Sequence, residues 1–425
     1  MIMNAEFMDI QKRMLAGEYG EPVRQGMEII TQLADFWEAP DIIPIQSVHM
    51  PGAAAKTARR AGRKYICWAA DNGGRFLTST TLNTGSADLT GVDLGIYPET
   101  MQQQLEITGS YKRMGAIECH TCTPYLVGNL PRFGEHVAWG ESSAVVFANS
   151  ILGARTNREG GPSALGSALT GFTAGYGLHL KENRVATVHA SVECPLSDVS
   201  DFGAAGYFLA RQFPDALPVF TGLPERSPMF GLKSLGAALA SSGSIAMFHA
   251  VGLTPEAPTL EIATGNKKLE TVRIGKKELE ETRQFLNRTN NSSDVDCVFL
   301  GCPHLDFEEL LLLTKLLSGR KVHPGVSLWL YAANSFWSSC ERSGLTRVLK
   351  DSGALLVSDT CPSISIFSEI MKSKGFQSAA TNSAKQAHYL PVWGIKVHFG
   401  STAACIEAAL TGKWKTESKI IERIR

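Results

Sequence analysis

Apolar residues recur every three or four positions near the N-terminus, whereas short apolar runs alternate with amphipathic stretches in the C-terminal third. The first pattern is typical of helices and predicts one at 8–16 and another at 21–37. The second pattern predicts strands that alternate with helices. The strands are expected at 296–300, 327–331 and 354–357, and the helices at 276–287, 306–317, 335–350 and after Ser383 and Ser401. This alternation indicates an α/β fold with a parallel sheet and helices on its faces.

The rest of the chain is less regular. Helices are also expected at 54–63 and 101–111, and residues 47–53, which include Pro51 and Gly52, are interpreted as a loop. The length of 425 residues suits two or three lobes. The lobes are predicted at about 1–115, 116–270 and 271–425.

A glycine-rich stretch lies in the central lobe. Seven glycines fall within residues 153–177, and glycine permits positive φ angles and close backbone approach. A linker would be poorer in Ala and Leu, so this stretch is interpreted as a loop that wraps a ligand.

Charge and hydropathy argue against several classes of protein. The chain has 41 Lys and Arg and 41 Asp and Glu, without the basic excess of a nucleic-acid-binding protein. No apolar run approaches the ~20 residues that span a bilayer. The N-terminus carries Glu6 and Asp9 and has no cationic region followed by an apolar stretch, so it does not resemble a signal peptide. Phosphate-loop, dinucleotide-binding and H-E-x-x-H motifs are absent. We therefore expect a cytoplasmic protein with neither a nucleic acid nor a membrane as partner.

Four of the nine cysteines precede a proline directly or, for Cys122, by one further residue, and proline lacks an N–H and stiffens a turn. These are Cys122, Cys194, Cys302 and Cys361. Cys302 and Cys361 each follow a predicted strand and are 59 positions apart, so their turns are expected at one sheet edge. Three thiolates on separate rigid loops suit an iron–sulfur cluster with an incomplete protein shell, which leaves one iron open as a Lewis acid.

Spacing alone favours a simpler interpretation, in which these cysteines are small buried residues without a ligand. A zinc half-site at Cys119 and Cys122 is a further alternative, but a structural zinc site needs a second pair, and the chain has no other C-x-x-C.

Five segments resemble the aconitase X family. They are GAIECHTCTPYL (115–126), WGESSAVVFANSILGARTNREGGPSAL (139–165), FLGCPH (299–304), SDTCP (358–362) and TNSAKQAHYLP (381–391). The resemblance runs from about His49 nearly to the C-terminus, and one mild departure is Gly140, where family members usually have alanine. It implies an aconitase-like fold of parallel sheets flanked by helices, without the swivelling small domain.

The resemblance also implies chemistry. It implies a hydro-lyase with an iron–sulfur cluster, between 2Fe–2S and 4Fe–4S, held by Cys122, Cys302 and Cys361. The implied substrate classes are cis-3-hydroxy-L-proline and mevalonate 5-phosphate. The first, which yields Δ1-pyrroline-2-carboxylate after tautomerisation, is ranked higher. A separate small subunit is expected to bring the swivelling domain with the catalytic serine, and the base. The expected assembly is therefore a heterodimer.

Two alternatives stay open at this stage. The first is the same fold acting on mevalonate 5-phosphate, for which Lys56, Arg59 and Arg60 form the densest cationic cluster. The second is a non-catalytic iron–sulfur sensor, although a sensor needs no substrate cradle.

Candidate substrate-binding residues carry groups that recognise a carboxylate, a hydroxyl or a ring nitrogen. They are Asn149, Ser150, Arg155, Asn157, Arg158 and Lys385. Lys385 lies just inside a predicted helix, where the helix N-terminus also favours anions. His304, two residues after Cys302, is a candidate acid or a residue that supports the cluster ligands.

Overall fold

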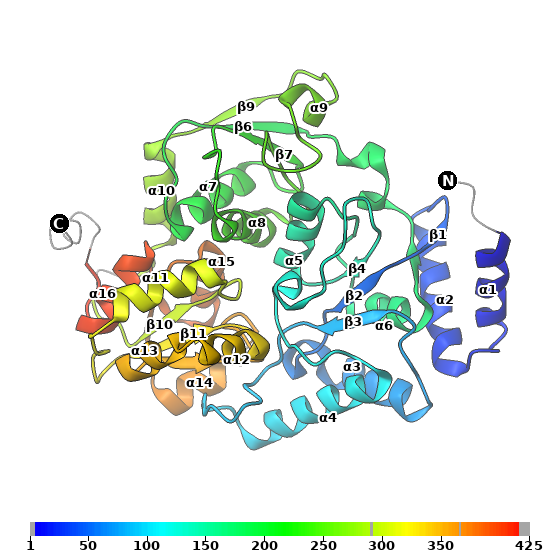
Figure 1. Ribbon diagram of the computed structural model, residues 1–425, viewed down its shortest axis with the longest axis horizontal. Coiled ribbons are helices and arrows are strands. Elements are labelled where there is room, and N and C mark those ends of the chain that lie inside the picture. The colour runs from blue at the N-terminus through cyan, green and yellow to red at the C-terminus, as the bar shows by residue number, and fades with distance from the viewer. Residues whose placement is uncertain (1–4, 290–291, 365–366, 416–425) are drawn as a thin grey trace.

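The computed structural model contains three parallel sheets and one antiparallel pair of strands, with helices packed around them (Figure 1). Its described part consists of residues 5–289, 292–364 and 367–415. One parallel sheet lies in each of three successive units of the chain. We call them the N-terminal unit (5–182), the central unit (186–286) and the C-terminal unit (292–415). The predicted α/β fold of parallel sheets flanked by helices is confirmed.

The N-terminal unit has a parallel sheet of strand order β3-β2-β4, and β1 pairs with β5 in antiparallel fashion. Its strands are β1 (Ile42–Pro44), β2 (Ser47–Met50), β3 (Ser79–Leu82), β4 (Ala138–Trp139) and β5 (Phe172–Ala174). Its helices are α1 (Ala5–Leu15), α2 (Glu21–Phe36), α3 (Ala55–Asp71), α4 (Pro98–Met114), α5 (Ser142–Phe147) and α6 (Gly161–Thr170).

Two predictions for this unit are wrong. Residues 47–50 form β2, the central strand of its sheet, because all four residues are buried and the strand pairs with β3 on one side and with β4 on the other. Much of the glycine-rich stretch forms α6 and β5 and not one continuous loop. Its glycines partly serve helix packing, since a Cβ at Gly166 would lie 2.9 Å from the carbonyl oxygen of Gly26 in α2.

The central unit has a parallel sheet of strand order β8-β7-β6-β9. Its strands are β6 (Val188–Val192), β7 (Pro218–Thr221), β8 (His249–Ala250) and β9 (Thr271–Ile274). Its helices are α7 (Val199–Gln212), α8 (Met229–Gly243), α9 (Leu260–Thr264) and α10 (Lys276–Leu286). The sheets thus divide the chain near residues 185 and 290, whereas the sequence pattern predicts lobe boundaries near 115 and 270.

The C-terminal unit has a parallel sheet of strand order β12-β11-β10-β13-β14. Its strands are β10 (Cys297–Leu300), β11 (Ser327–Tyr331), β12 (Leu355–Val357), β13 (Ser378–Thr381) and β14 (Lys396–Phe399). Its helices are α11 (Phe307–Leu317), α12 (Asn334–Arg342), α13 (Leu345–Ser352), α14 (Phe367–Lys374), α15 (Ala384–Tyr389) and α16 (Thr402–Thr411). The single helix predicted at 335–350 is two helices, because Gly344 adopts a left-handed conformation with φ 77°.

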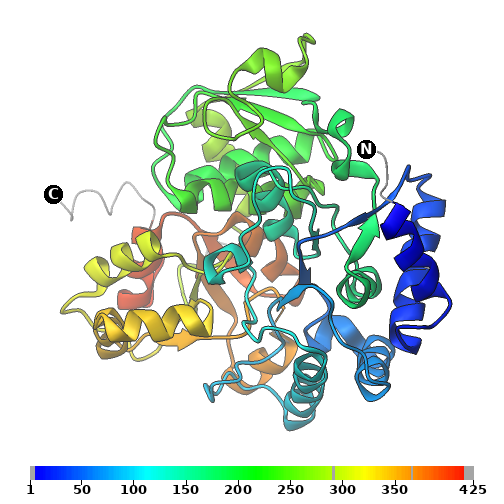
Figure 2. The same ribbon diagram turned by 45° about the vertical axis from the view of Figure 1, so that its right-hand side comes forward.

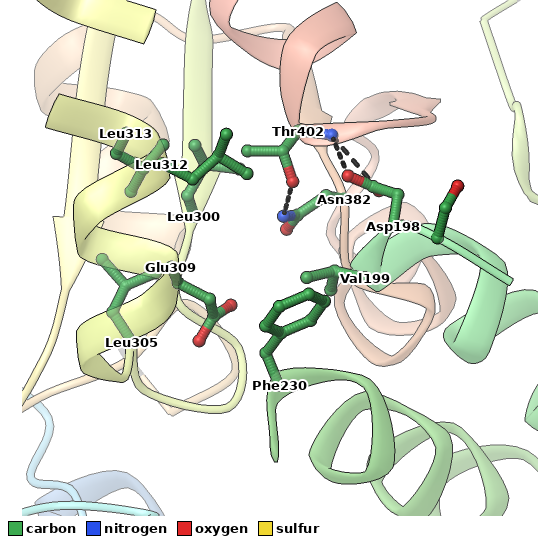
Figure 3. Close-up of a pocket in the computed structure, with 11 residues that line it drawn as sticks. Asp198, Val199, Phe230, Leu300, Leu305, Glu309, Leu312, Leu313, Asn382 and Thr402 are labelled. Carbon is green, nitrogen blue, oxygen red and sulfur yellow. Dashed lines mark hydrogen bonds between the residues drawn. The ribbon is translucent and has the colours of Figure 1, made fainter. Parts of the chain in front are cut away.

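The central and C-terminal units lie against each other (Figure 2). They share one hydrophobic core, in which Phe202 and Phe220 belong to the same cluster as Phe299. Polar contacts join them as well, because the carboxylate of Asp198 accepts hydrogen bonds from the backbone amide of Thr402 (Figure 3). The two units are therefore one packed body that holds the loops between them. No helix in the described residues is both long and apolar enough to cross a membrane.

Candidate active site

A cavity of about 310 Å³ lies where strands of the C-terminal sheet end. Cys302 follows β10, Cys361 follows β12 and Lys385 lies in α15 after β13. Ligands of parallel α/β sheets bind beyond these carboxyl ends. The polar side chains that line the cavity include those of Asn83, Thr84, Cys122, Glu141, Ser142, Cys302, Cys361, Ser363, Lys385 and Tyr389. The edge of the C-terminal sheet thus brings together the three cysteines that the sequence predicts as cluster ligands and further residues of the N-terminal unit.

The three cysteines are buried, with 5% to 8% of each residue exposed, and none forms a disulfide. Burial raises the pKa of Cys302 to about 11 and also raises the pKa values of Cys122 and Cys361. Their charges also oppose one another, so the thiolate forms need a cationic partner. A bound metal centre supplies that charge, and the donor set of three thiols therefore fits a metal–sulfur group.

In the described residues, no three histidine, cysteine or acidic side chains converge closely enough to hold a single metal ion. The iron atoms of a cluster lie apart, so its ligands are spread more widely than those of one ion. Cys194, the fourth cysteine beside a proline, is not among the residues that line the cavity.

Lys385 and Glu141 form a buried ion pair at the cavity wall. The ammonium donates to Glu141 Oε1 at 2.7 Å and to the hydroxyl of Ser142 at 3.1 Å. Burial opposes the charge of Glu141, but Lys385 and its hydrogen bonds hold the pKa of this carboxyl at about 2. Burial likewise opposes the charge of Lys385, and the Glu141 carboxylate raises the pKa of this lysine. Both groups are therefore charged at neutral pH.

Glu141 is held by the start of α5. It is the N-cap of this helix, and its Oε2 accepts from the backbone amide of Ala144 at 2.7 Å and from the hydroxyl of Ser143 at 2.6 Å. Both oxygens of the Glu141 carboxylate thus accept hydrogen bonds from the protein. Its contribution to the cavity is to hold the ammonium of Lys385 in place. Sequence reasoning missed Glu141, although it lies inside a segment that carries the family resemblance. Asn83 and Thr84 were missed too, and their place directly after β3 was the available signal.

His304 does not line the cavity, and its ring is completely buried. Its Nδ1 lies 2.9 Å from the hydroxyl of Thr121, and its Nε2 lies 2.9 Å from the carbonyl oxygen of Thr360. Burial lowers the pKa of His304 to about 4, so the ring is neutral. Its backbone amide donates to the sulfur of Cys122 at 3.2 Å. With both ring nitrogens bonded, His304 fits a supporting role better than proton transfer.

Five predicted substrate-binding residues are not among those that line the cavity. They are Asn149, Ser150, Arg155, Asn157 and Arg158. Their polar groups bond mainly to backbone: the amide of Asn149, for example, bridges to Thr156 and Ala246, and the hydroxyl of Ser150 accepts from the amide of Phe248. These bonds fix the chain between α5 and α6, because a buried polar group needs a partner.

The guanidinium of Arg155 and the amide of Asn157 also donate to backbone carbonyls, and exposed Arg158 reaches the carbonyl of Ser244. Among the basic residues considered for a phosphate, Lys56 does not line the cavity itself but contacts two residues that do. Its ammonium donates to the carbonyl of Ser363 and lies 4.3 Å from the centre of the Trp393 ring. Arg59 and Arg60 are exposed.

Three family models match this chain, and each of them covers one of its three units. The family models for the aconitase X first, second and third domains match residues 4–182, 186–284 and 295–411. The phosphomevalonate dehydratase large subunit of Methanothermobacter thermautotrophicus is 39% identical over 90% of this chain and 92% of its own length. The cis-3-hydroxy-L-proline dehydratase of Pseudomonas aeruginosa is 36% identical over 94% of this chain and 69% of its own length.

A solved structure agrees with these matches. The holo-form crystal structure of Thermococcus kodakaraensis aconitase X has a TM-score of 0.85 and 35% identity, and the match covers 96% of this chain and 100% of that one. Together these findings define the class of protein as a hydro-lyase, an enzyme that removes water from its substrate. The chain belongs to the aconitase X family.

Proposed function

We propose that this chain is the cluster-bearing large subunit of a dehydratase for a small hydroxylated carboxylate. The observation that carries the proposal is the convergence of Cys122, Cys302 and Cys361 on one cavity beside Lys385. An iron–sulfur cluster held by the three thiolates would supply a Lewis acid for the departing hydroxyl.

Lys385 is proposed to bind the substrate carboxylate. An ammonium has three N–H groups, of which Glu141 and Ser142 take two, and the third is left for an anion in the cavity. The ion pair with Glu141 keeps Lys385 charged and in place while the substrate binds. The cavity walls from two units also reduce access of water to the reacting group, which strengthens the carboxylate–ammonium attraction.

The proposed enzyme also needs a second subunit. Several relatives are named as large subunits, which supports a small subunit for this chain. We propose that the small subunit brings the catalytic serine and the base that takes the proton next to the carboxylate. The expected assembly is a heterodimer, in which the cavity lies at the interface.

The proposed substrate is cis-3-hydroxy-L-proline, and the product after tautomerisation is Δ1-pyrroline-2-carboxylate. Among the described residues that line the cavity, Lys385 is the only cationic side chain. One lysine, already paired with a carboxylate, suits an amino acid with one carboxylate and one positive charge. A phosphorylated substrate brings more negative charge and needs further cations.

Mevalonate 5-phosphate is the second candidate. Relatives named for the phosphorylated substrate are 35% to 39% identical to this chain, and the chain covers 92% to 98% of their length. It covers 68% to 69% of the hydroxyproline dehydratases. On this alternative, we propose Lys56 as the cation for the phosphate, because its ammonium contacts Ser363 and Trp393, which both line the cavity.

The test is anaerobic co-expression with the small subunit, followed by dehydratase assays on both compounds. Turnover of cis-3-hydroxy-L-proline, with a KM unaffected by Lys56→Met, supports the first substrate. Turnover of mevalonate 5-phosphate alone, with a KM that rises in Lys56→Met, assigns the second. A complex that contains iron but dehydrates neither compound contradicts the proposal and favours a sensor.

A further inference from the structure

The buried peptide unit and ring of His304 contact all three loops that carry the cavity cysteines. His304 lies two positions after Cys302 on the loop between β10 and α11. Its amide reaches Cys122, and its ring lies between Thr121 and Thr360, the residues that directly precede Cys122 and Cys361.

The partners determine the tautomer of this ring. The carbonyl oxygen of Thr360 can only accept a hydrogen bond, so Nε2 carries the hydrogen. Nδ1 is then the acceptor for the hydroxyl of Thr121. A neutral histidine has one donor and one acceptor, and here each is directed at a different cysteine loop.

The central unit is tied to the same residue. The ammonium of Lys233 in α8 donates to the carbonyl oxygen of His304 at 2.7 Å, and it pairs with the carboxylates of Asp306 and Glu309. The loops therefore meet at a point fixed by all three units of the chain.

We infer that His304 is the positioning residue that fixes the spacing of the Cys122, Cys302 and Cys361 loops, through the two hydrogen bonds of its ring. The backbone N–H of His304 also donates a hydrogen bond to the sulfur of Cys122. This bond stabilises the thiolate directly, because a hydrogen bond to the charged form of a group favours that form. This inference rests on the proposed function for the identity of the bound group, but the loop contacts are those of this chain.

Two variants separate the two ring contacts. His304→Ala removes both bonds, whereas His304→Gln keeps an amide donor near the Nε2 position for the Thr360 carbonyl but has no acceptor at the Nδ1 position that faces Thr121. A matched control is His398→Ala, since His398 is also buried in the C-terminal unit and bonds to one backbone carbonyl, that of Asp294.

The measurement is the rate at which iodoacetamide alkylates each cysteine of the two-subunit complex after chelation of its iron, with mass spectrometry as readout. Loss of a buried hydrogen bond is expected to increase local opening about tenfold. In His304→Ala, both Cys122 and Cys361 are expected to react about tenfold faster than in the wild type. In His304→Gln, Cys361 is expected to return to the wild-type rate while Cys122 stays fast. His398→Ala is expected to leave both rates unchanged.

The electron paramagnetic resonance spectrum of the iron-loaded complex gives a second readout. A changed spectrum in His304→Ala and an unchanged one in His398→Ala are expected, because only the first alters the ligand spacing. Wild-type alkylation rates in His304→Ala, or equal acceleration in His398→Ala, would overturn the inference. If His304→Ala yields no folded complex, the per-cysteine pattern of His304→Gln decides. A wild-type complex without iron refutes the proposed function, while the alkylation pattern still tests this inference.

Discussion

The ammonium of Lys385 lies 2.7 Å from a carboxylate oxygen of Glu141, although 244 positions separate the two residues in the chain. Both side chains are 9% exposed, and they come from different units, α15 and the start of α5. The pair therefore closes the cavity wall between the N-terminal and C-terminal units and holds one cation next to the three cysteines.

Replacing Lys385 with methionine is expected to reduce both stability and substrate binding. The substitution leaves Glu141 charged and buried without its cation, which costs about 3–5 kcal/mol for a broken buried pair. It also removes the group that we propose for the substrate carboxylate, so KM is expected to rise. Urea unfolding and steady-state kinetics of the complex measure the two effects.

The double variant Lys385→Met with Glu141→Gln separates these effects. Since it removes both charges, most of the lost stability is expected to return, whereas activity stays low. A Lys385→Met enzyme with wild-type KM would show that this lysine does not contact the substrate.

Glu309 is expected to make the stability of the protein depend on pH. Its carboxylate points toward the small cavity of about 30 Å³ beside Phe230 and also pairs with Lys233 (Figure 3). Burial raises the pKa of Glu309 from 4.5 to about 7, although Lys233 opposes this shift. The folded protein therefore keeps a proton that the unfolded chain releases between about pH 4.5 and pH 7. The contribution of Glu309 to the free energy of unfolding is thus largest below this window and is lost as the pH rises through it.

Urea unfolding of the wild type and of Glu309→Gln at several pH values tests whether the free energy of unfolding falls as the pH rises. The free energy of unfolding is expected to fall more steeply with rising pH in the wild type than in Glu309→Gln, which cannot titrate. Parallel curves for the two proteins would mean that the carboxyl is ionised throughout the window.

Gly166→Ala is expected to destabilise the N-terminal unit. The added Cβ would lie 2.9 Å from the carbonyl oxygen of Gly26, so α2 and α6 must move apart. Such overpacking costs about 1–3 kcal/mol. Gly109→Ala is the matched control, because Gly109 lies inside α4 with no atom within 4 Å of an added Cβ. There the removal of a helical glycine is expected to add about 0.5–1 kcal/mol. Opposite shifts of the unfolding midpoint are the expected result, and a stable Gly166→Ala protein would contradict the close packing.

The C-terminal sheet was predictable because its strands are short apolar runs separated by amphipathic helices. β2 was not, since its sequence Ser47–Met50 contains polar residues that are buried by pairing on both sides and by contacts with distant segments. The break in the helix predicted at 335–350 follows from the left-handed backbone of Gly344, which a sequence does not reveal by composition alone.

The candidate site also has features that the sequence predicts and others that it does not. Cys302 and Cys361 were found because they follow strands and precede prolines, and sheet topology then brings their loops to one cavity. The glycine-rich stretch is predicted to wrap a ligand, but its Asn157 bonds to the backbone carbonyl of Tyr176, and its Gly166 packs against another helix. Contacts such as that between the His304 amide and Cys122, 182 positions apart, depend on how whole units pack.

The iron and acid-labile sulfide content of the anaerobically purified complex tests the central claim most directly. We predict that the wild type contains both and that Cys302→Ala loses them together with dehydratase activity. Cys194→Ala is the matched control, because Cys194 also precedes a proline but is not among the residues that line the cavity. It is expected to keep the wild-type content and rate. An active wild-type complex without iron, or a Cys302→Ala complex with full iron and sulfide, would contradict the assignment of a cluster to these three cysteines.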